Sequence, residues 1–266
     1  MSRFDEQVMT DNEEEHEPQE HGPVKSFLEH LEDFRWVLVK ILSAVSLSWL
    51  ACFYFGPSIL KFLQYPLKLS GVATDPSKFL TVFSPMDAFS ISFQLALYSG
   101  LVVASPLVMY FIASYVLPAL TGKERRLIAP AFWLGALFFL LGVAFCYFVV
   151  LPPSLAVSVE FTRWLNLNAS FWTVESYVSF VTKFMLGMGI AFEMPLVILV
   201  LVQCEVLNYT MLSRTRRYAI VTIVIVSAVL TPPDVVSLLI MALPLVLMYE
   251  ACIWISWFME RKKNAR

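Results

Sequence analysis

The chain has 266 residues, of which 58% are hydrophobic and 15% charged, and its mean hydropathy is +0.70. A water-soluble domain cannot bury this much apolar side chain, so the composition excludes an ordinary soluble protein and indicates a chain that resides in lipid. The formal net charge of −2 gives no indication of a nucleic-acid partner.

Three segments differ in composition. Residues 1–24 form an acidic tail that includes "DNEEEHEPQE", and this composition predicts disorder. Residues 25–259 carry the apolar runs and are the predicted membrane domain, and residues 260–266 form a short basic tail. Thirty-five mostly polar residues precede the first apolar run, which is therefore not expected to be a cleaved signal peptide.

The stretch "FLEHLEDFRWVLVK" (27–40) joins the tail to the first apolar run. Its apolar residues recur at helical spacing, and Glu29, Glu32 and Asp33 form an acidic side. The pattern predicts an amphipathic helix before the first span. An ordinary solvated helix face explains the same pattern equally well.

Six apolar runs follow, separated by linkers that carry Pro, Gly, Asn and most of the charge. A helix needs about 20 residues to cross the hydrocarbon core of a bilayer. The predicted fold class is therefore an all-α polytopic membrane protein with six transmembrane helices. These helices are expected at 36–56, 86–117, 127–151, 176–202, 218–230 and 236–258.

The predicted spans differ in length. The fifth, 218–230, has only 13 residues, and we expect the fifth and sixth helices to be short. The second is long and contains Pro106, which predicts a kink or a tilt. Helices this unequal cannot form a regular cylinder, so a concave wall is expected, with the bilayer thinned beside the short helices.

The two long linkers on the far side of the membrane from the termini are amphipathic. The first, "SILKFLQYPLKLSGV", contains Pro66, and the second, "SLAVSVEFTRWLNL" (154–167), contains Trp164. Both are predicted to form short helices that lie at the membrane interface.

The distribution of basic residues predicts the orientation. Four Lys and Arg residues (Lys61, Lys68, Lys78 and Arg163) lie on one side of the predicted spans. Thirteen, counted from Lys25 to Arg266, lie on the other side, which is also the side of both termini. The positive-inside rule therefore predicts cytoplasmic N and C termini.

The turn "ALTGKERRLIAP" (119–130) lies between the second and third spans. Lys123, Arg125 and Arg126 are explained by the orientation of the spans, because basic residues keep this turn on the cytoplasmic side. Glu124 contributes little to orientation. A carboxylate here is able to accept two hydrogen bonds from one guanidinium. The sequence leaves open whether that guanidinium belongs to a neighbouring arginine or to a ligand.

The stretch "GMGIAFEMPLV" (187–197) places Glu193 and Pro195 inside the fourth apolar run. An ionised carboxylate at mid-span costs about 2.5–3.5 kcal/mol on insertion scales. Lys183 is ten residues away on the same predicted helix, too far for an ion pair. Glu193 is therefore protonated, paired with another helix, or open to a water-filled concavity.

Two further polar features precede or lie within the sixth span. In "LTPPDVVS" (230–237), Pro232 and Pro233 predict an extended corner, and Asp234 is placed to cap the following helix. Glu250 lies within the span itself. Glu193 and Glu250 together define an alternative function, a proton-coupled solute transporter in which the two acids form a relay.

Catalytic and metal sites are not predicted. The four cysteines lie singly in or beside apolar runs, which is typical of buried hydrophobic side chains. The three histidines all precede the first span, and the sequence contains no HExxH, GxSG or GxGD motif. We therefore expect no metal, no cofactor and no enzymatic activity.

Taken together, six motifs resemble TatC, the receptor subunit of the twin-arginine protein translocase. They are "HLEDFR" (30–35), "LPALTGKERR" (117–126), "FCYFVVLP" (145–152), "SYVSFVTKF" (176–184), "AFEMP" (191–195) and "LTPPDVVS" (230–237). They occur in the order of the family and span most of the chain. Two departures are Phe34 in place of the usual Leu and Asp33 in place of the usual Glu.

The resemblance implies a six-helix concave wall in the bacterial cytoplasmic (inner) membrane. It also implies a receptor for the twin-arginine signal peptides of folded cargo proteins, which binds them at its cytoplasmic face. Such a protein recruits TatA- and TatB-type single-span subunits, assembles with other TatC copies in the lipid bilayer, and depends on the proton-motive force. No covalent chemistry is implied.

The resemblance also assigns residues to roles. It implies that Glu124 and Asp33 recognise the signal peptide, and that Glu193 lies where partner helices pack. Other positions also match family motifs: Arg35, Tyr115 and Arg126 on the signal-peptide side, Pro195 beside Glu193, and the structural prolines Pro66 and Pro106.

Overall fold

The computed structural model describes the backbone of residues 27–72, 75, 79–119, 122–166, 172–204, 206–231 and 234–264. Side chains are described for the same residues except 27–30, 119, 122–128 and 262–264. The chain divides into two compact units, Met1–Trp36 and Val37–Arg266. The predicted acidic tail, 1–24, lies outside the described residues.

The first described helix, α1, runs from Phe27 to Tyr54. The predicted amphipathic helix at 27–40 and the first predicted span are therefore one continuous helix. Two short helices, α2 (Gly56–Leu63) and α3 (Tyr65–Leu69), follow it. They replace the single interfacial helix predicted for this linker, and the Pro66 ring is fully buried in α3.

Helix α5 (Pro85–Val116) corresponds to the second predicted span. Its start is fixed by a capping box, in which the Ser84 N–H donates to Asp87 Oδ2 and the Met86 N–H donates to Ser84 Oγ. Pro106 lies inside the helix and removes the N–H that the Val102 carbonyl would accept. The Ser105 hydroxyl donates to that carbonyl at 2.8 Å, so the acceptor keeps a partner.

The third predicted span continues further than expected. Helix α6 (Gly122–Phe145) passes through a π-helical turn, Cys146–Val150, into α7 (Leu151–Trp164). The prediction of a separate helix at 154–167 is therefore wrong, because this segment extends the third span. The run from Ala129 to Trp164 is apolar enough over its 36 residues to cross a membrane.

The last three helices are α8 (Val174–Gln203), α9 (Tyr209–Leu230) and α10 (Val235–Asn264). Helix α9 has 22 residues, so it begins before the predicted position, and only its C-terminal part is apolar. Helix α10 has 30 residues, so the prediction of a short sixth helix is wrong. Much of the predicted basic tail continues α10, because Lys and Arg favour helix.

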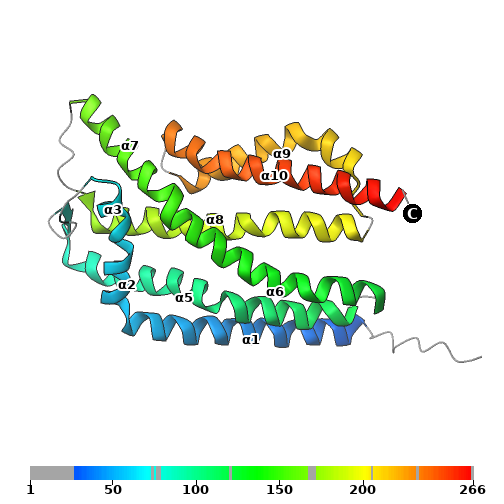
Figure 1. The fold of residues 1–266 in the computed structure, drawn as a ribbon. Coiled ribbons are helices and arrows are strands. Elements are labelled where there is room, and N and C mark those ends of the chain that lie inside the picture. The colour runs from blue at the N-terminus through cyan, green and yellow to red at the C-terminus, as the bar shows by residue number, and fades with distance from the viewer. Residues whose placement is uncertain are drawn as a thin grey trace, which may run out of the picture. The chain divides into compact units, whose positions relative to one another are not determined.

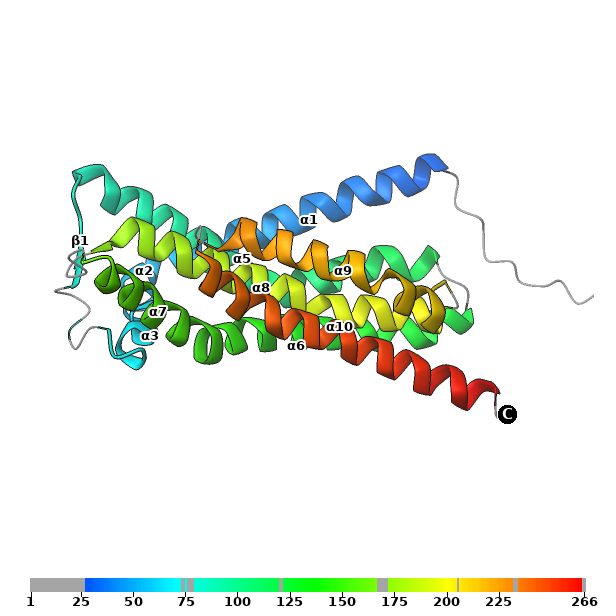
Figure 2. The same ribbon diagram turned by 90° about the horizontal axis from the view of Figure 1, so that it is seen from above.

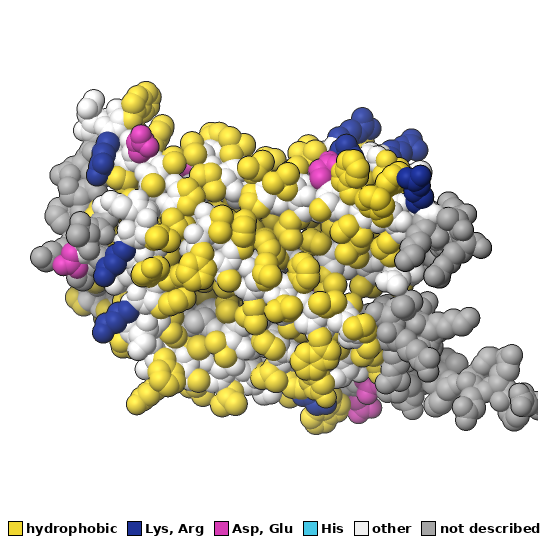
Figure 3. All heavy atoms as spheres, viewed as in Figure 1, with side chains coloured by type: hydrophobic (Ala, Val, Ile, Leu, Met, Phe, Trp, Pro, Cys, Tyr) yellow, Lys and Arg dark blue, Asp and Glu magenta, His cyan; other side chains and the backbone are white. Residues whose placement is uncertain are grey.

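Five helices within the described parts of the chain are long and apolar enough to cross a membrane. They lie at Leu31–Tyr54, Pro85–Val116, Ala129–Trp164, Val174–Gln203 and Val235–Arg261. Helix α9, the fifth predicted span, is not among them. On the face drawn in Figure 3, hydrophobic side chains form a broad band, and charged side chains lie toward its ends. This is the surface expected of a protein that faces lipid.

Within Val37–Arg266, α8 is the central helix and packs against α5, α6, α9 and α10 (Figures 1 and 2). Small residues permit these close contacts. A Cβ atom built on Gly142 of α6 lies 2.7 Å from Phe192 Cβ and 2.9 Å from the Met188 carbonyl oxygen of α8. A Cβ atom on Gly187 of α8 comes closer still to Leu230 Cδ1 of α9. At these two glycines, the backbone of one helix therefore lies in direct contact with the neighbouring helix.

We expect Gly142→Ala to destabilise the protein by about 1–3 kcal/mol, because the added methyl group overlaps Phe192 and the α8 backbone. Thermal unfolding in detergent measures the change. Gly56→Ala is the matched control, since a Cβ atom there meets nothing within 4 Å. Equal melting temperatures for the two variants would contradict the close α6–α8 contact.

The linker before α5 and the linker before α8 are joined by a short parallel sheet, and two tyrosines bond to α2 in the first of these linkers. Strand β1 (Leu80–Thr81) pairs with β2 (Trp172–Thr173). The Tyr147 hydroxyl donates to the Phe62 carbonyl at 2.7 Å, and the Tyr177 hydroxyl donates to the Leu63 carbonyl at 2.6 Å. Both carbonyls belong to the last turn of α2, where the Phe62 carbonyl also accepts a backbone hydrogen bond of the helix cap. These two hydrogen bonds therefore hold the α2–α3 linker against the π-helical turn and α8.

Tyr177→Phe is expected to lower stability by about 1–3 kcal/mol, because it leaves the buried Leu63 carbonyl without its donor. Hydrogen exchange across residues 56–69 measures the local effect and should quicken. Tyr54→Phe serves as a control, since the Tyr54 side chain is 82% exposed. Unchanged exchange in Tyr177→Phe would show that packing alone holds the linker.

Candidate functional site

The carboxyl group of Glu193 lies where α8 meets α5 and α6. A Cβ atom built on Gly135 of α6 lies 3.0 Å from Glu193 Oε2 and 2.5 Å from Met109 Cε of α5. Gly135 therefore leaves the space that the carboxyl group occupies. Glu193 Oε1 is buried and has no hydrogen-bond partner among the described residues. A buried acceptor without a donor costs about 1–3 kcal/mol.

Pro195 follows two residues later and is buried in the same helix. Because proline has no N–H, the carbonyl of Ala191 loses the donor that an α-helix supplies four residues on. One turn of α8 thus carries the Glu193 carboxyl group, and the Ala191 carbonyl near it lacks its helical donor. Unsatisfied polar groups within a membrane span are uncommon, and they mark functional sites more often than structural ones.

Glu250 has a different environment. Its Oε1 lies 3.0 Å from Arg216 Nε, in an ion pair that joins α10 to α9. The neighbouring Tyr249 hydroxyl donates to the Leu212 carbonyl at 3.0 Å, across the same two helices. Glu250 is therefore part of the contact that holds α9 against α10. This pairing does not fit the relay of two free acids that a proton-coupled solute transporter requires.

The residues expected to recognise a signal peptide lie on two segments of the chain. Asp33 is half-buried and Arg35 is exposed, and both belong to α1. Tyr115 is half-buried in the last turn of α5. The side chains of Glu124 and Arg126, in the first turns of α6, lie outside the described residues.

The corner before α10 is described in part. Pro232 and Pro233 lie outside the described residues. Asp234 directly precedes α10, and its Oδ1 accepts a hydrogen bond of 2.6 Å from the Ser237 N–H. This is the geometry of an N-terminal cap. The Thr231 hydroxyl donates to the Ser227 carbonyl at 2.9 Å at the end of α9.

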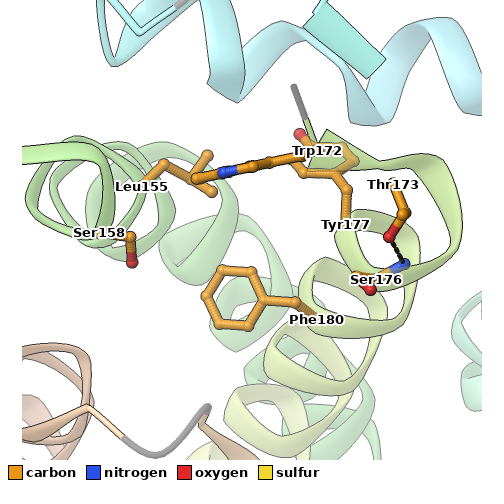
Figure 4. A pocket seen from close by; sticks show the side chains of 7 residues that line it. All are labelled: Leu155, Ser158, Trp172, Thr173, Ser176, Tyr177 and Phe180. Atoms are coloured by element: carbon orange, nitrogen blue, oxygen red, sulfur yellow. Dashed lines mark hydrogen bonds between the residues drawn. The ribbon is translucent and has the colours of Figure 1, made fainter. Parts of the chain in front are cut away.

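A pocket of about 330 Å³ lies between α7 and the start of α8 (Figure 4). Its lining combines Trp172, Tyr177 and Phe180 with the hydroxyl groups of Ser158, Thr173 and Ser176. Thr173 Oγ1 accepts a hydrogen bond from the Ser176 N–H and so begins α8. The sequence did not predict this pocket. Its two walls come from α7 and from the start of α8, and no pattern in the sequence indicates that these two segments lie next to each other. No charged side chain lines it, and no group of three metal-ligating side chains occurs among the described residues.

Comparison with known proteins identifies the family. The family model described as Sec-independent protein translocase protein (TatC) matches residues 29–244. A TatC protein of Akkermansia muciniphila is 39% identical over 197 residues, which are 74% of this chain and 56% of that protein. A TatC protein of Aquifex aeolicus is 33% identical over 238 residues, which are 89% of this chain and 96% of that protein. The chain thus spans little more than half of the first relative and nearly all of the second.

A solved structure shares the fold. The crystal structure of a twin arginine translocase receptor, TatC, matches with a TM-score of 0.75 and 33% sequence identity. The match covers 86% of this chain and 98% of that chain. The chain therefore belongs to the TatC family of Sec-independent protein translocase proteins, which are all-helical polytopic membrane proteins of protein transport and not enzymes.

Proposed function

We propose that this chain is the receptor subunit of a twin-arginine translocase. It binds the twin-arginine signal peptides of folded precursor proteins at its cytoplasmic face and recruits TatA- and TatB-type single-span subunits. Export is driven by the proton-motive force. The observation that carries the proposal is the family match over residues 29–244, together with a solved relative described as a twin arginine translocase receptor.

Signal-peptide recognition rests on charge complementarity. A twin-arginine signal presents two adjacent guanidinium groups, and carboxylates bind such groups through paired, charge-assisted hydrogen bonds. Glu124 and Asp33 supply carboxylates in the segments that resemble the family motifs, and Arg35, Tyr115 and Arg126 lie beside them in sequence. The excess of Lys and Arg on the side of both termini supports a cytoplasmic location in the inner membrane.

Partner recruitment rests on Glu193. Its Oε1 is buried without a partner among the described residues, so a donor from another subunit that reaches this position would satisfy it. Interhelical hydrogen bonds of this kind contribute to the association of helices in membranes. Glu193 and Pro195 therefore mark the site at which we place a TatA- or TatB-type helix.

Co-purification with a precursor tests the receptor function directly. The chain is purified with a precursor that carries a twin-arginine signal, and in parallel with the same precursor in which both arginines are replaced by lysine. We expect capture to fall at least tenfold, because lysine cannot form the bidentate bond. Equal capture of the two precursors would refute the proposal.

A further inference from the structure

Three arginines, Arg214, Arg216 and Arg217, lie in the first half of α9, and they have different partners. Arg216 is held by the ion pair with Glu250 of α10. The other carboxylate described at this end of α10, Glu260, accepts a hydrogen bond of 2.5 Å from the Tyr209 N–H at the start of α9. Both acids therefore already have partners. Arg214 and Arg217 form no ion pair with the described residues, so none of the described acids compensates their two positive charges.

The two unpaired arginines lie on the outward face of α9. Met211, Tyr218, Val221 and Ile225 are each 50–59% exposed and are separated by seven, three and four residues, which places them on one stripe of the helix. Arg214 continues this stripe, three residues after Met211 and four before Tyr218, and Arg217 lies directly beside it. Helix α9 is not among the helices long and apolar enough to cross a membrane, but its C-terminal part is apolar, and an exposed apolar stripe there is suited to contact with lipid acyl chains. The arginines therefore lie where the stripe reaches the headgroups.

Aromatic rings support the guanidinium groups at this level. The Arg217 guanidinium lies 4.7 Å from the centroid of the Tyr218 ring and donates a hydrogen bond of 2.9 Å to its hydroxyl. On α10, Arg261 lies 5.2 Å from the Trp257 ring. Tyr and Trp are enriched at the boundary between hydrocarbon and headgroups. The rings thus place these cations at the membrane surface.

The charge of the surface limits what binds to it. A twin-arginine signal is itself cationic, so this surface repels the ligand of the proposed function. Guanidinium groups bind phosphate through paired hydrogen bonds. We infer that Arg214 and Arg217 bind the phosphate group of an anionic phospholipid, whose acyl chains lie along Val221 and Ile225.

Photolabelling in nanodiscs tests the site. The full chain is placed in phosphatidylcholine discs that contain a trace of phosphatidylglycerol with a photoactivatable acyl chain, and labelled residues are mapped by mass spectrometry. A phosphatidylcholine analogue with the same reactive chain gives the reference. We expect residues 218–226 to be labelled about 25-fold more by the anionic lipid, since each arginine near the surface contributes about fivefold. Equal labelling by both lipids overturns the inference.

Four variants and one competitor make the test specific. Arg214→Gln with Arg217→Gln should reduce the ratio of labelling on α9 to about one and leave labelling of α5 unchanged, whereas replacement of both by lysine should retain most of the preference. Arg217→Gln is compared with Arg216→Gln, which removes the same charge from a residue that faces α10. The single variants decide the matter if the double variant does not fold. Equal loss in both single variants, or full competition by inorganic phosphate, overturns the lipid site.

Discussion

Glu124→Lys is expected to reduce the capture of a twin-arginine precursor by at least about 30-fold, because removal of one partner from a bound charge pair costs 2–5 kcal/mol and the new lysine repels the signal. The proposed contact places the Glu124 carboxylate against the arginine pair. Capture is measured by co-purification from detergent-solubilised membranes and by crosslinking to the signal peptide.

The control for this variant separates recognition from folding. Glu160→Lys makes the same change of charge on α7, at an exposed position outside the proposed binding segments. Both variants should retain the melting temperature of the unmodified protein, and Glu160→Lys should retain capture. Crosslinking at the normal level in Glu124→Lys would exclude a direct role for this carboxylate.

The membrane class and the central helices could be predicted from the sequence, because long apolar runs report directly on a lipid environment. The first, second and fourth predicted spans correspond to α1, α5 and α8. The Glu193–Pro195 segment could also be located, since an acid and a proline stand out within an apolar run. The concave shape stays a prediction.

The α6–α7 helix could not be predicted, because Pro152 and Pro153 are typical of a helix end. The structure places both prolines in the first turn of α7, directly after the π-helical turn. At that position a proline removes few helical hydrogen bonds, and its ring fits the backbone angles. The Leu151 N–H donates to the Cys146 carbonyl, so the wider turn carries the helix past the prolines.

The start of α9 was misplaced for a different reason. Arg214, Arg216 and Arg217 were assigned to a linker because they are charged, although arginine is a good helix former. Only the fold brings Arg216 to Glu250 on the next helix. The sequence around Glu250 does not indicate this ion pair. From the sequence alone, Glu250 is therefore interpreted as an unpaired acid within the membrane.

Glu193→Met is expected to change stability and transport in opposite directions. Glu193 Oε1 is buried without a partner among the described residues, and its carboxyl group lies beside Met109 and Leu196. Methionine has a similar length and no polar atom that requires a donor. We expect the free energy of unfolding to rise by about 1–3 kcal/mol, because the unsatisfied group is removed.

Transport should fall in the same variant, because the proposed partner helix loses the acceptor to which it bonds. We expect the amount of co-purified TatA- or TatB-type subunit to fall about 3- to 20-fold, the range of interhelical hydrogen bonds in membranes. Precursor capture should stay normal, which separates this role from that of Glu124. A variant that is more stable and still exports precursor at the normal rate would show that the carboxyl group has no part in assembly. Loss of both stability and export would instead indicate a structural role. A residue that is retained only for function is expected to lower the stability of the fold, so its replacement should raise the free energy of unfolding.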